Sequence, residues 1–118
     1  MNKSNEIGKL GEQTAENYLI GKGYKIVKKN FHFGKLGEID IIAEKDGKLI
    51  FLEVKVQKSD NFGDPHFWIT PAKQNRLRKV AEGYLYINGI KEMNCQFDAI
   101  FIDLRYNPPL VDHIENAF

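Results

Sequence analysis

Two apolar strands and the tight turn between them constrain this chain more than any other feature. The stretch runs from Gly37 to Lys55 and reads GEIDIIAEKDGKLIFLEVK. At its centre, Asp46-Gly47 is a dipeptide typical of two-residue hairpin turns. The charged residues that interrupt the two strands stand mainly at the ends far from this turn. The stretch therefore predicts a β-hairpin with a charged patch at its open end.

Counting outward from the turn predicts the register of the hairpin. Asp40 then lies opposite Glu53, and Glu38 lies opposite Lys55. Directly opposite residues share a face of the sheet, as do residues two apart in one strand, so all four side chains converge. Opposed carboxylates repel each other unless a positive group lies between them. A divalent cation and Lys55 are the two candidates, provided that no one-residue slip turns one strand over.

Length and composition indicate an ordinary soluble globular protein. The 118 residues suit a single domain over residues 1–118, with 42% hydrophobic and 28% charged residues. The single cysteine, Cys95, has no partner for an internal disulfide or a zinc-thiolate site, which favours a reducing compartment. Neither a signal peptide nor an apolar run long enough to span a membrane is apparent. A cytoplasmic location with no membrane partner is the resulting expectation.

The distribution of charge says more than its sum. The net charge of +1 does not by itself indicate a nucleic-acid-binding protein. However, residues 21–37 contain five lysines and no acid, and residues 73–79 contain four basic residues and no acid. Segregated basic residues can form a face that attracts phosphate, although lysines also keep strand edges from aggregating. The candidate nucleic-acid contacts are Lys28, Lys29, Lys35 and Arg76, with Trp68 as a base-stacking residue.

The segments outside the hairpin predict helices on a mixed sheet. Residues 4–21 predict an amphipathic helix whose apolar stripe is Ile7, Leu10, Ala15, Tyr18 and Leu19. Strands are expected at residues 24–33, 96–104 and 110–114, and a second helix at residues 70–87, with Thr70 as N-cap before Pro71. A helix between strands implies a parallel crossover. The expected fold is therefore α/β or α+β, a central mixed sheet flanked by helices.

Both helices bring polar side chains toward the hairpin. Glu12 borders the apolar stripe of the first helix, where it either leans toward the sheet or stays exposed. Lys73 and Gln74 lie in the first turn of the second helix and point toward the end of the sheet. A helix N-terminus with such residues suits an anion, and a plain basic surface helix is the alternative. In the hairpin itself, Ile39 and Ile41 are expected on the same face.

Carboxylates on neighbouring strands, followed by a lysine, suit metal-assisted phosphodiester hydrolysis. Mg²⁺ takes carboxylate oxygens and keeps several waters, so Asp40, Glu53 and the Val54 carbonyl are the candidate ligands. The ion would lower the pKa of a bound water, and Lys55 would orient that water or stabilise the developing charge. Glu12 could complete the ligand set. The competing interpretation is a surface ion-pair ladder, with Glu38 on Lys55 and Asp40 solvated.

Several motifs resemble the YraN family, also called UPF0102. They are G-x-x-G-E-x-x-A-x-x-Y-L at residues 8–19, G-E-I-D at 37–40, E-V-K at 53–55, the Lys73 helix, F-D at 97–98 and the closing A-F. That family is similar to the PD-(D/E)XK nucleases, especially archaeal Holliday junction resolvases. The resemblance implies a restriction-endonuclease-like αβββαβ core, Mg²⁺ (or Mn²⁺) on Asp40 and Glu53, a catalytic Lys55 and an accessory Glu12.

From the motifs and the resemblance together, we expect a metal-dependent endonuclease acting on nucleic acid, with branched DNA as one candidate substrate. A homodimer is a further expectation, because a junction resolvase must cut two strands. Two other interpretations stay open. One is a non-catalytic module that binds nucleic acid or protein, and the other is a structural domain whose carboxylates form only ion pairs.

Overall fold

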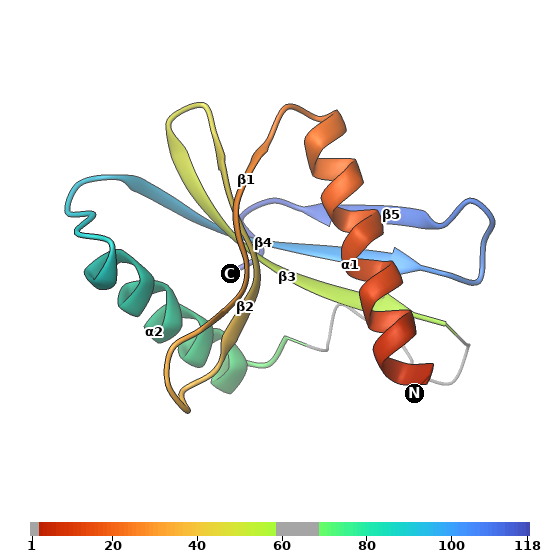
Figure 1. Cartoon of the computed structure of the whole chain (residues 1–118), viewed down its shortest axis with the longest axis horizontal. Coiled ribbons are helices and arrows are strands. Elements are labelled where there is room, and N and C mark those ends of the chain that lie inside the picture. Colours follow the sequence, from red (N-terminus) through yellow and green to blue (C-terminus); the bar gives the residue numbers. More distant parts are fainter. Residues whose placement is uncertain (1–2, 59–68) are drawn as a thin grey trace.

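The computed structural model describes residues 3–58 and 69–118, which form one five-stranded sheet with a helix on each face (Figure 1). The strand order is β1-β2-β3-β4-β5. Only β3 and β4 pair in parallel, and the other neighbours are antiparallel. The elements are α1 (Lys3–Gly21), β1 (Lys25–His32), β2 (Glu38–Lys45), β3 (Lys48–Gln57), α2 (Pro71–Ile87), β4 (Asn94–Asp103) and β5 (Leu110–Ile114). The predicted α+β fold is confirmed, and its topology is compatible with a restriction-endonuclease-like core.

Local signals placed most of the element boundaries. The second helix begins where the Thr70-Pro71 pair predicts, because the Thr70 hydroxyl accepts a hydrogen bond of 3.2 Å from the Lys73 amide. It ends at Ile87, and the side chain of the C-cap residue Asn88 donates to the Tyr84 carbonyl at 2.8 Å. The fourth strand starts at Asn94 rather than at residue 96. Its earlier start follows from the parallel partner, because Lys48 of β3 pairs with Asn94.

The sheet is buried on both faces, and each helix covers one of them. On the α1 side, Ala15 and Leu19 pack with β-strand residues such as Ile41, Leu52 and Ile100. On the α2 side the buried cluster contains Ile39, Ile42, Leu49, Phe51, Leu77, Val80, Ala81 and Tyr84. Because both faces of this mixed sheet are covered, its central strands read as continuous apolar runs instead of alternating.

Two sequence-based assignments of side chains to the core were wrong. Ile39 belongs to the α2-side cluster, whereas Ile41 faces α1. The alternation breaks where β2 has lost its pairing with β3 but remains paired with β1. At this level β1 contains Asn30, whose φ of 52° is left-handed, so the regular alternation of side chains is interrupted. Leu10 is 53% exposed. The buried stripe of α1 is narrow and runs through Gly11, Ala15 and Leu19, at a spacing of four residues, which leaves Leu10 outside it.

A buried polar network ties β4 and β5 to α1. Asp98 has no exposed surface, and its carboxylate interacts with His113 Nε2 at 2.8 Å and accepts from the Gln96 amide at 2.9 Å. The other ring nitrogen of His113 lies 3.1 Å from the Tyr18 hydroxyl. The Asn116 amide also donates to Asp98, at 3.0 Å. The network therefore fixes the last strand against the first helix.

No helix within the residues that the structure describes is long and apolar enough to span a membrane.

A glycine lets α1 approach β3 closely. A Cβ atom on Gly11 would lie 2.1 Å from Cγ2 of Val56, a separation that no real pair of carbon atoms adopts. A methyl group would therefore push the helix away from the strand. Because Glu12 is the next residue, this contact also sets how near Glu12 comes to the charged end of β3.

We expect Gly11→Ala to lower the free energy of unfolding by about 1–3 kcal/mol through overpacking against Val56. Gly8→Ala is the matched control, because nothing lies within 4 Å of its added Cβ, and alanine is the better helix former by about 1 kcal/mol. Urea unfolding followed by circular dichroism measures both. Equal stability of the two variants would contradict a tight contact at Gly11.

Candidate functional site at the open end of the hairpin

The register predicted from the turn is correct for every pair that the ladder contains. Lys45 lies opposite Lys48, and the pairing continues to Ile41 opposite Leu52. The pairing of β2 with β3 stops one residue further on. The count predicted that Asp40 and Glu53 would also pair, and this part of the prediction is wrong. The strands separate at the point where two opposed carboxylates would otherwise lie about 5 Å apart, an unfavourable arrangement.

The Asp40 side chain replaces the missing backbone partner. Its Oδ2 accepts a hydrogen bond of 2.8 Å from the Val54 amide, which the departing β2 no longer satisfies. In a strand, the N–H and C=O groups of one residue point to the same side. The Val54 carbonyl is therefore directed toward the same gap as the Asp40 carboxylate. This arrangement places a carboxylate and a main-chain oxygen side by side.

Glu38 has a different partner from the predicted one. It pairs with His32 of β1, and the His32 Nε2 lies 2.9 Å from the Glu38 Oε2. Among the described residues, no ion pair joins Glu38 to Lys55. The prediction failed because it counted only across the turn between β2 and β3. Counting across the 33–37 connection as well would have placed His32 opposite Glu38, which the sequence analysis missed.

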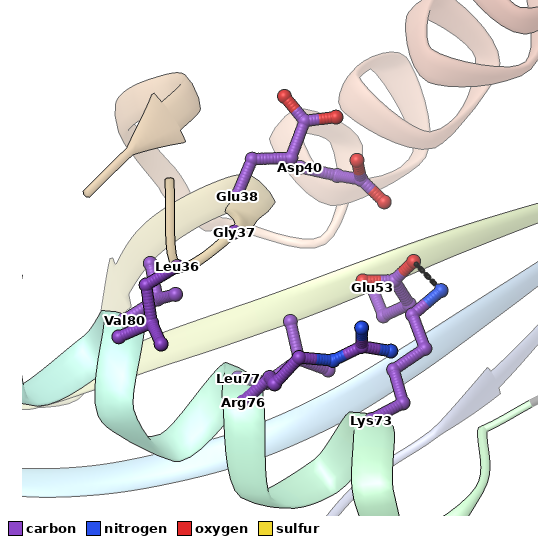
Figure 2. Close-up of a pocket in the computed structure, with 9 residues that line it drawn as sticks. All are labelled: Leu36, Gly37, Glu38, Asp40, Glu53, Lys73, Arg76, Leu77 and Val80. Atoms are coloured by element: carbon purple, nitrogen blue, oxygen red, sulfur yellow. Dashed lines mark ion pairs between the residues drawn. The ribbon is translucent and has the colours of Figure 1, made fainter. Parts of the chain in front are cut away.

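Glu53 is buried and carries two lysines on one oxygen. Its Oε1 lies 2.9 Å from the Lys73 Nζ and 3.5 Å from the Lys55 Nζ (Figure 2 shows the first pair). Only 8% of the Glu53 side chain is exposed. Lys55 comes from the same strand two residues later, whereas Lys73 comes from the first turn of α2. The structure thus brings together the predicted Asp40, Glu53, Lys55 and Lys73.

A cavity of about 180 Å³ opens in front of the two carboxylates. Figure 2 shows it between the start of β2, the middle of β3 and the first turns of α2. Its lining residues are Leu36, Gly37, Glu38, Asp40, Glu53, Lys73, Arg76, Leu77 and Val80. Gly37 has φ of 151°, and a Cβ there would already contact Val80, so glycine suits this wall.

Two predicted residues border neighbouring cavities instead. Lys55 lines one between β3 and β5, together with Phe101 and Asp112. Gln74 lines another beside the C-terminal residues, and its amide donates to the Ile69 carbonyl at 3.2 Å. Gln74 therefore stabilises the start of α2 and does not line the cavity at Asp40, because the helix turns it away.

Glu12 does extend toward the site. Burial raises the pKa of its carboxyl, partly opposed by a hydrogen bond with Asn30, and the negative charges of Glu38 and Glu53 raise it further. A glutamate that was merely exposed on the helix would not respond to these neighbours. The contribution of Asn30 had no signal in the sequence, because it depends on how β1 passes under α1.

The electrostatics of the cluster are those of crowded negative charge. Burial, together with the negative charges of nearby glutamates, raises the pKa of Asp40 from 3.8 to about 7, although the hydrogen bond from Val54 opposes the shift. The cluster would thus gain from a positive group near Asp40. A bound cation could supply that charge.

The pKa values of Lys55 and Lys73 shift in opposite directions. Burial and the contact with Lys73 lower the pKa of Lys55, although Glu53 opposes them. Burial alone would also lower the pKa of Lys73, but the contacts with Lys55 and Glu53 outweigh it and raise the pKa. Lys73 is therefore the more firmly charged partner of Glu53.

The donor set fits a hard cation that keeps part of its water shell. Asp40, Glu53 and the Val54 carbonyl offer oxygen ligands of the kind that Mg²⁺ and Mn²⁺ prefer. Among residues 3–58 and 69–118, no group of three or more histidine, cysteine or acidic side chains could hold a metal ion. A cation here would need the main-chain oxygen and several waters, which is the usual situation for Mg²⁺.

Of the predicted nucleic-acid contacts that the structure describes, only Arg76 lines the cavity at Asp40. Lys28, Lys29, Lys35 and Arg76 are all exposed. Lys29 is engaged with Glu16 of α1, at 3.2 Å, which reduces the charge it offers to a ligand. Trp68 lies outside the described residues. Their role in binding stays a prediction.

We expect Asp40→Asn to unfold less readily than the wild type at pH 8 when a chelator removes divalent cations. A carboxyl with a folded pKa of about 7 and an unfolded pKa near 3.8 binds its proton more tightly when folded. The wild type therefore loses stability as the pH rises between these values, by up to about 4 kcal/mol, whereas asparagine does not titrate. Urea unfolding at pH 4 and pH 8 measures the difference.

Asp103→Asn is the control for that experiment. Its hydrogen bond with Arg105 lowers the pKa of Asp103, so this variant should be destabilised at neutral pH and approach the wild type in acid. A stability gain for Asp40→Asn that is the same at both pH values would contradict a raised pKa at Asp40.

Comparison with known proteins places the chain in a family. The model of the uncharacterised protein family UPF0102 matches residues 11–102. A UPF0102 protein of Thermodesulfovibrio yellowstonii is 44% identical over 113 residues, covering 96% of each chain. One from Alkaliphilus oremlandii is 42% identical over the whole of both chains, and one from Syntrophomonas wolfei is 40% identical over 96% of this chain and 97% of its own. The chain therefore belongs to the uncharacterised protein family UPF0102.

Proposed function

We propose that this protein is a Mg²⁺- or Mn²⁺-dependent endonuclease of the PD-(D/E)XK type that hydrolyses phosphodiester bonds in DNA. The observation that carries the proposal is the gap between β2 and β3. There, the Asp40 carboxylate is held by the Val54 amide beside the buried Glu53 and its two lysines. Ionisable groups concentrated in a buried cluster with a raised carboxyl pKa are typical of functional sites.

Each residue has a defined task in this proposal. Asp40, Glu53 and the Val54 carbonyl would hold the cation, which would lower the pKa of a bound water and neutralise charge on the phosphate. Lys55 lies at 3.5 Å from Glu53, so its ammonium group is positioned to orient the attacking water or stabilise the negative charge that develops. Glu12 would add negative charge near the cation from α1. Arg76 at the rim of the cavity contacts the nucleic-acid backbone.

The substrate we favour is branched, flapped or single-stranded DNA. The cavity of about 180 Å³ lies between the 33–37 connection and α2, and Lys73 and Arg76 in its lining suit a backbone phosphate. Exposed lysines stand on β1, which is the neighbour of β2 in the sheet, and the exposed Arg76 stands on α2. Cutting both strands of a junction would require a homodimer.

We expect the purified protein to cleave fluorescently labelled branched or single-stranded DNA when Mg²⁺ is present. Cleavage should fall at least about 100-fold in Asp40→Asn and in Lys55→Gln, because each removes a group that acts at the reacting phosphate. Lys48→Gln is the control for the second variant, since it removes an exposed lysine from the same strand at the far end. Denaturing gel electrophoresis measures the cleaved fraction.

Three outcomes would contradict the proposal. DNA binding without cleavage in Mg²⁺ or Mn²⁺ would favour a non-catalytic binding module. Equal heats from the wild type and Asp40→Asn in a calorimetric Mn²⁺ titration would contradict a metal site at Asp40. The absence of both metal and DNA binding would leave Glu53 and its lysines as a structural ion-pair cluster.

A further inference from the structure

One carboxylate oxygen of Glu53 contacts the ammonium groups of two lysines. Oε1 lies 2.9 Å from the Lys73 Nζ and 3.5 Å from the Lys55 Nζ. The shorter contact is made by the residue from α2, and it crosses the cavity from the helix to the strand (Figure 2). The ion pair is largely sheltered from water, because the side chains of Lys73 and Glu53 are 25% and 8% exposed.

The Lys73 ammonium stands where a cation on Glu53 would compete with it. A Mg²⁺–oxygen bond is about 2.1 Å long, so the ion would come close to any ammonium group already at that oxygen. Like charges about 4 Å apart repel each other strongly in a partly buried site. The ammonium and the cation therefore cannot both keep close contact with this carboxylate at low cost.

Of the two lysines, only Lys73 lines the cavity that also contains Asp40 and Glu53. Its side chain lines the cavity of about 180 Å³, together with Arg76 and Glu38. The four-carbon stem rotates freely and carries a compact charge. Lys55 instead lines the cavity on the β5 side and sits farther from the oxygen.

We propose that Lys73 is the counter-ion of Glu53 in the cation-free protein and yields that oxygen to the bound cation, turning its ammonium group into the cavity to bind the substrate phosphate. The inference rests on the proposed function, since it takes Glu53 as a ligand of the cation. Lys73 thereby couples the two ligands, because binding the cation creates part of the phosphate site. Cation and nucleic acid then strengthen each other's binding, as linkage requires.

The first test is a calorimetric Mn²⁺ titration without nucleic acid. Lys73→Met removes the competing ammonium and keeps the apolar stem, so we expect its Mn²⁺ affinity to rise at least about threefold. Arg76→Met is the control, because Arg76 lines the same cavity but forms no ion pair with Glu53 among the described residues. The Mn²⁺ affinity of this variant should differ from that of the wild type by less than about twofold. Unchanged or weaker binding by Lys73→Met would overturn the inference.

The second test follows Lys73 in the wild-type protein, which avoids any doubt about folding of the variant. The ¹⁵N resonance of its ammonium group, assigned with Lys73→Arg, is recorded during titration with diamagnetic Mg²⁺. We expect the resonance to shift and its protons to exchange faster with water as Mg²⁺ saturates the site. A resonance that keeps its position and exchange rate at saturation would overturn the inference.

The third test addresses the phosphate. With Ca²⁺ in place of Mg²⁺ to prevent cleavage, Lys73→Met should weaken binding of labelled single-stranded DNA at least about threefold, and without a divalent cation it should have little effect. Equal weakening under both conditions would contradict the coupling.

Asp40→Asn separates this inference from the proposed function. If Asp40→Asn binds Mn²⁺ as the wild type does, the metal site itself fails. If Asp40→Asn no longer binds Mn²⁺ and Lys73→Met binds it no more tightly than the wild type, the metal site stands and only the inferred role of Lys73 is contradicted.

Discussion

A single hydrogen bond, from the Val54 amide to the Asp40 carboxylate, marks where the regular hairpin ends and the candidate site begins. The two strands could not continue their ladder without setting Asp40 directly against Glu53. Instead they part, and the side chain of one strand satisfies the backbone of the other. The parting directs the Val54 main-chain oxygen toward the Asp40 carboxylate and leaves room for the cavity. The site is therefore a consequence of how the sheet ends, and both helices are arranged around it.

The helices contribute by how closely they approach this point. Gly11 allows α1 to lie against Val56, which brings Glu12 within electrostatic reach of the cluster. The Thr70 cap fixes the start of α2, so that Lys73, three residues later, points at Glu53. Neither contact stabilises the fold as much as the two buried clusters do. Both decide instead which charges meet at the end of β3, and that balance of charges underlies the proposed function.

Much of this could be predicted from the sequence, for identifiable reasons. The Asp46-Gly47 turn determined the register as far as Ile41 opposite Leu52, because a two-residue turn leaves no freedom in the count. The Thr70-Pro71 pair placed the start of α2 for a similarly local reason. The predictions failed at Ile39 and at Glu38, where alternation was counted beyond the residues of β2 that pair with β3. The Asp98 and His113 network was missed altogether, since its members are distant in sequence and lie on neighbouring strands.

The sequence by itself determined the elements, the family and the four residues at the open end of the hairpin, because turns, caps and short motifs are local. Only the tertiary structure decided what each charge touches. Glu38 takes His32 rather than Lys55, Lys73 reaches Glu53, and Gln74 turns away to the backbone. These outcomes depend on where the strands separate and how near each helix packs. Separations of a few ångströms between distant segments determine which ion pairs form, and no local pattern encodes them.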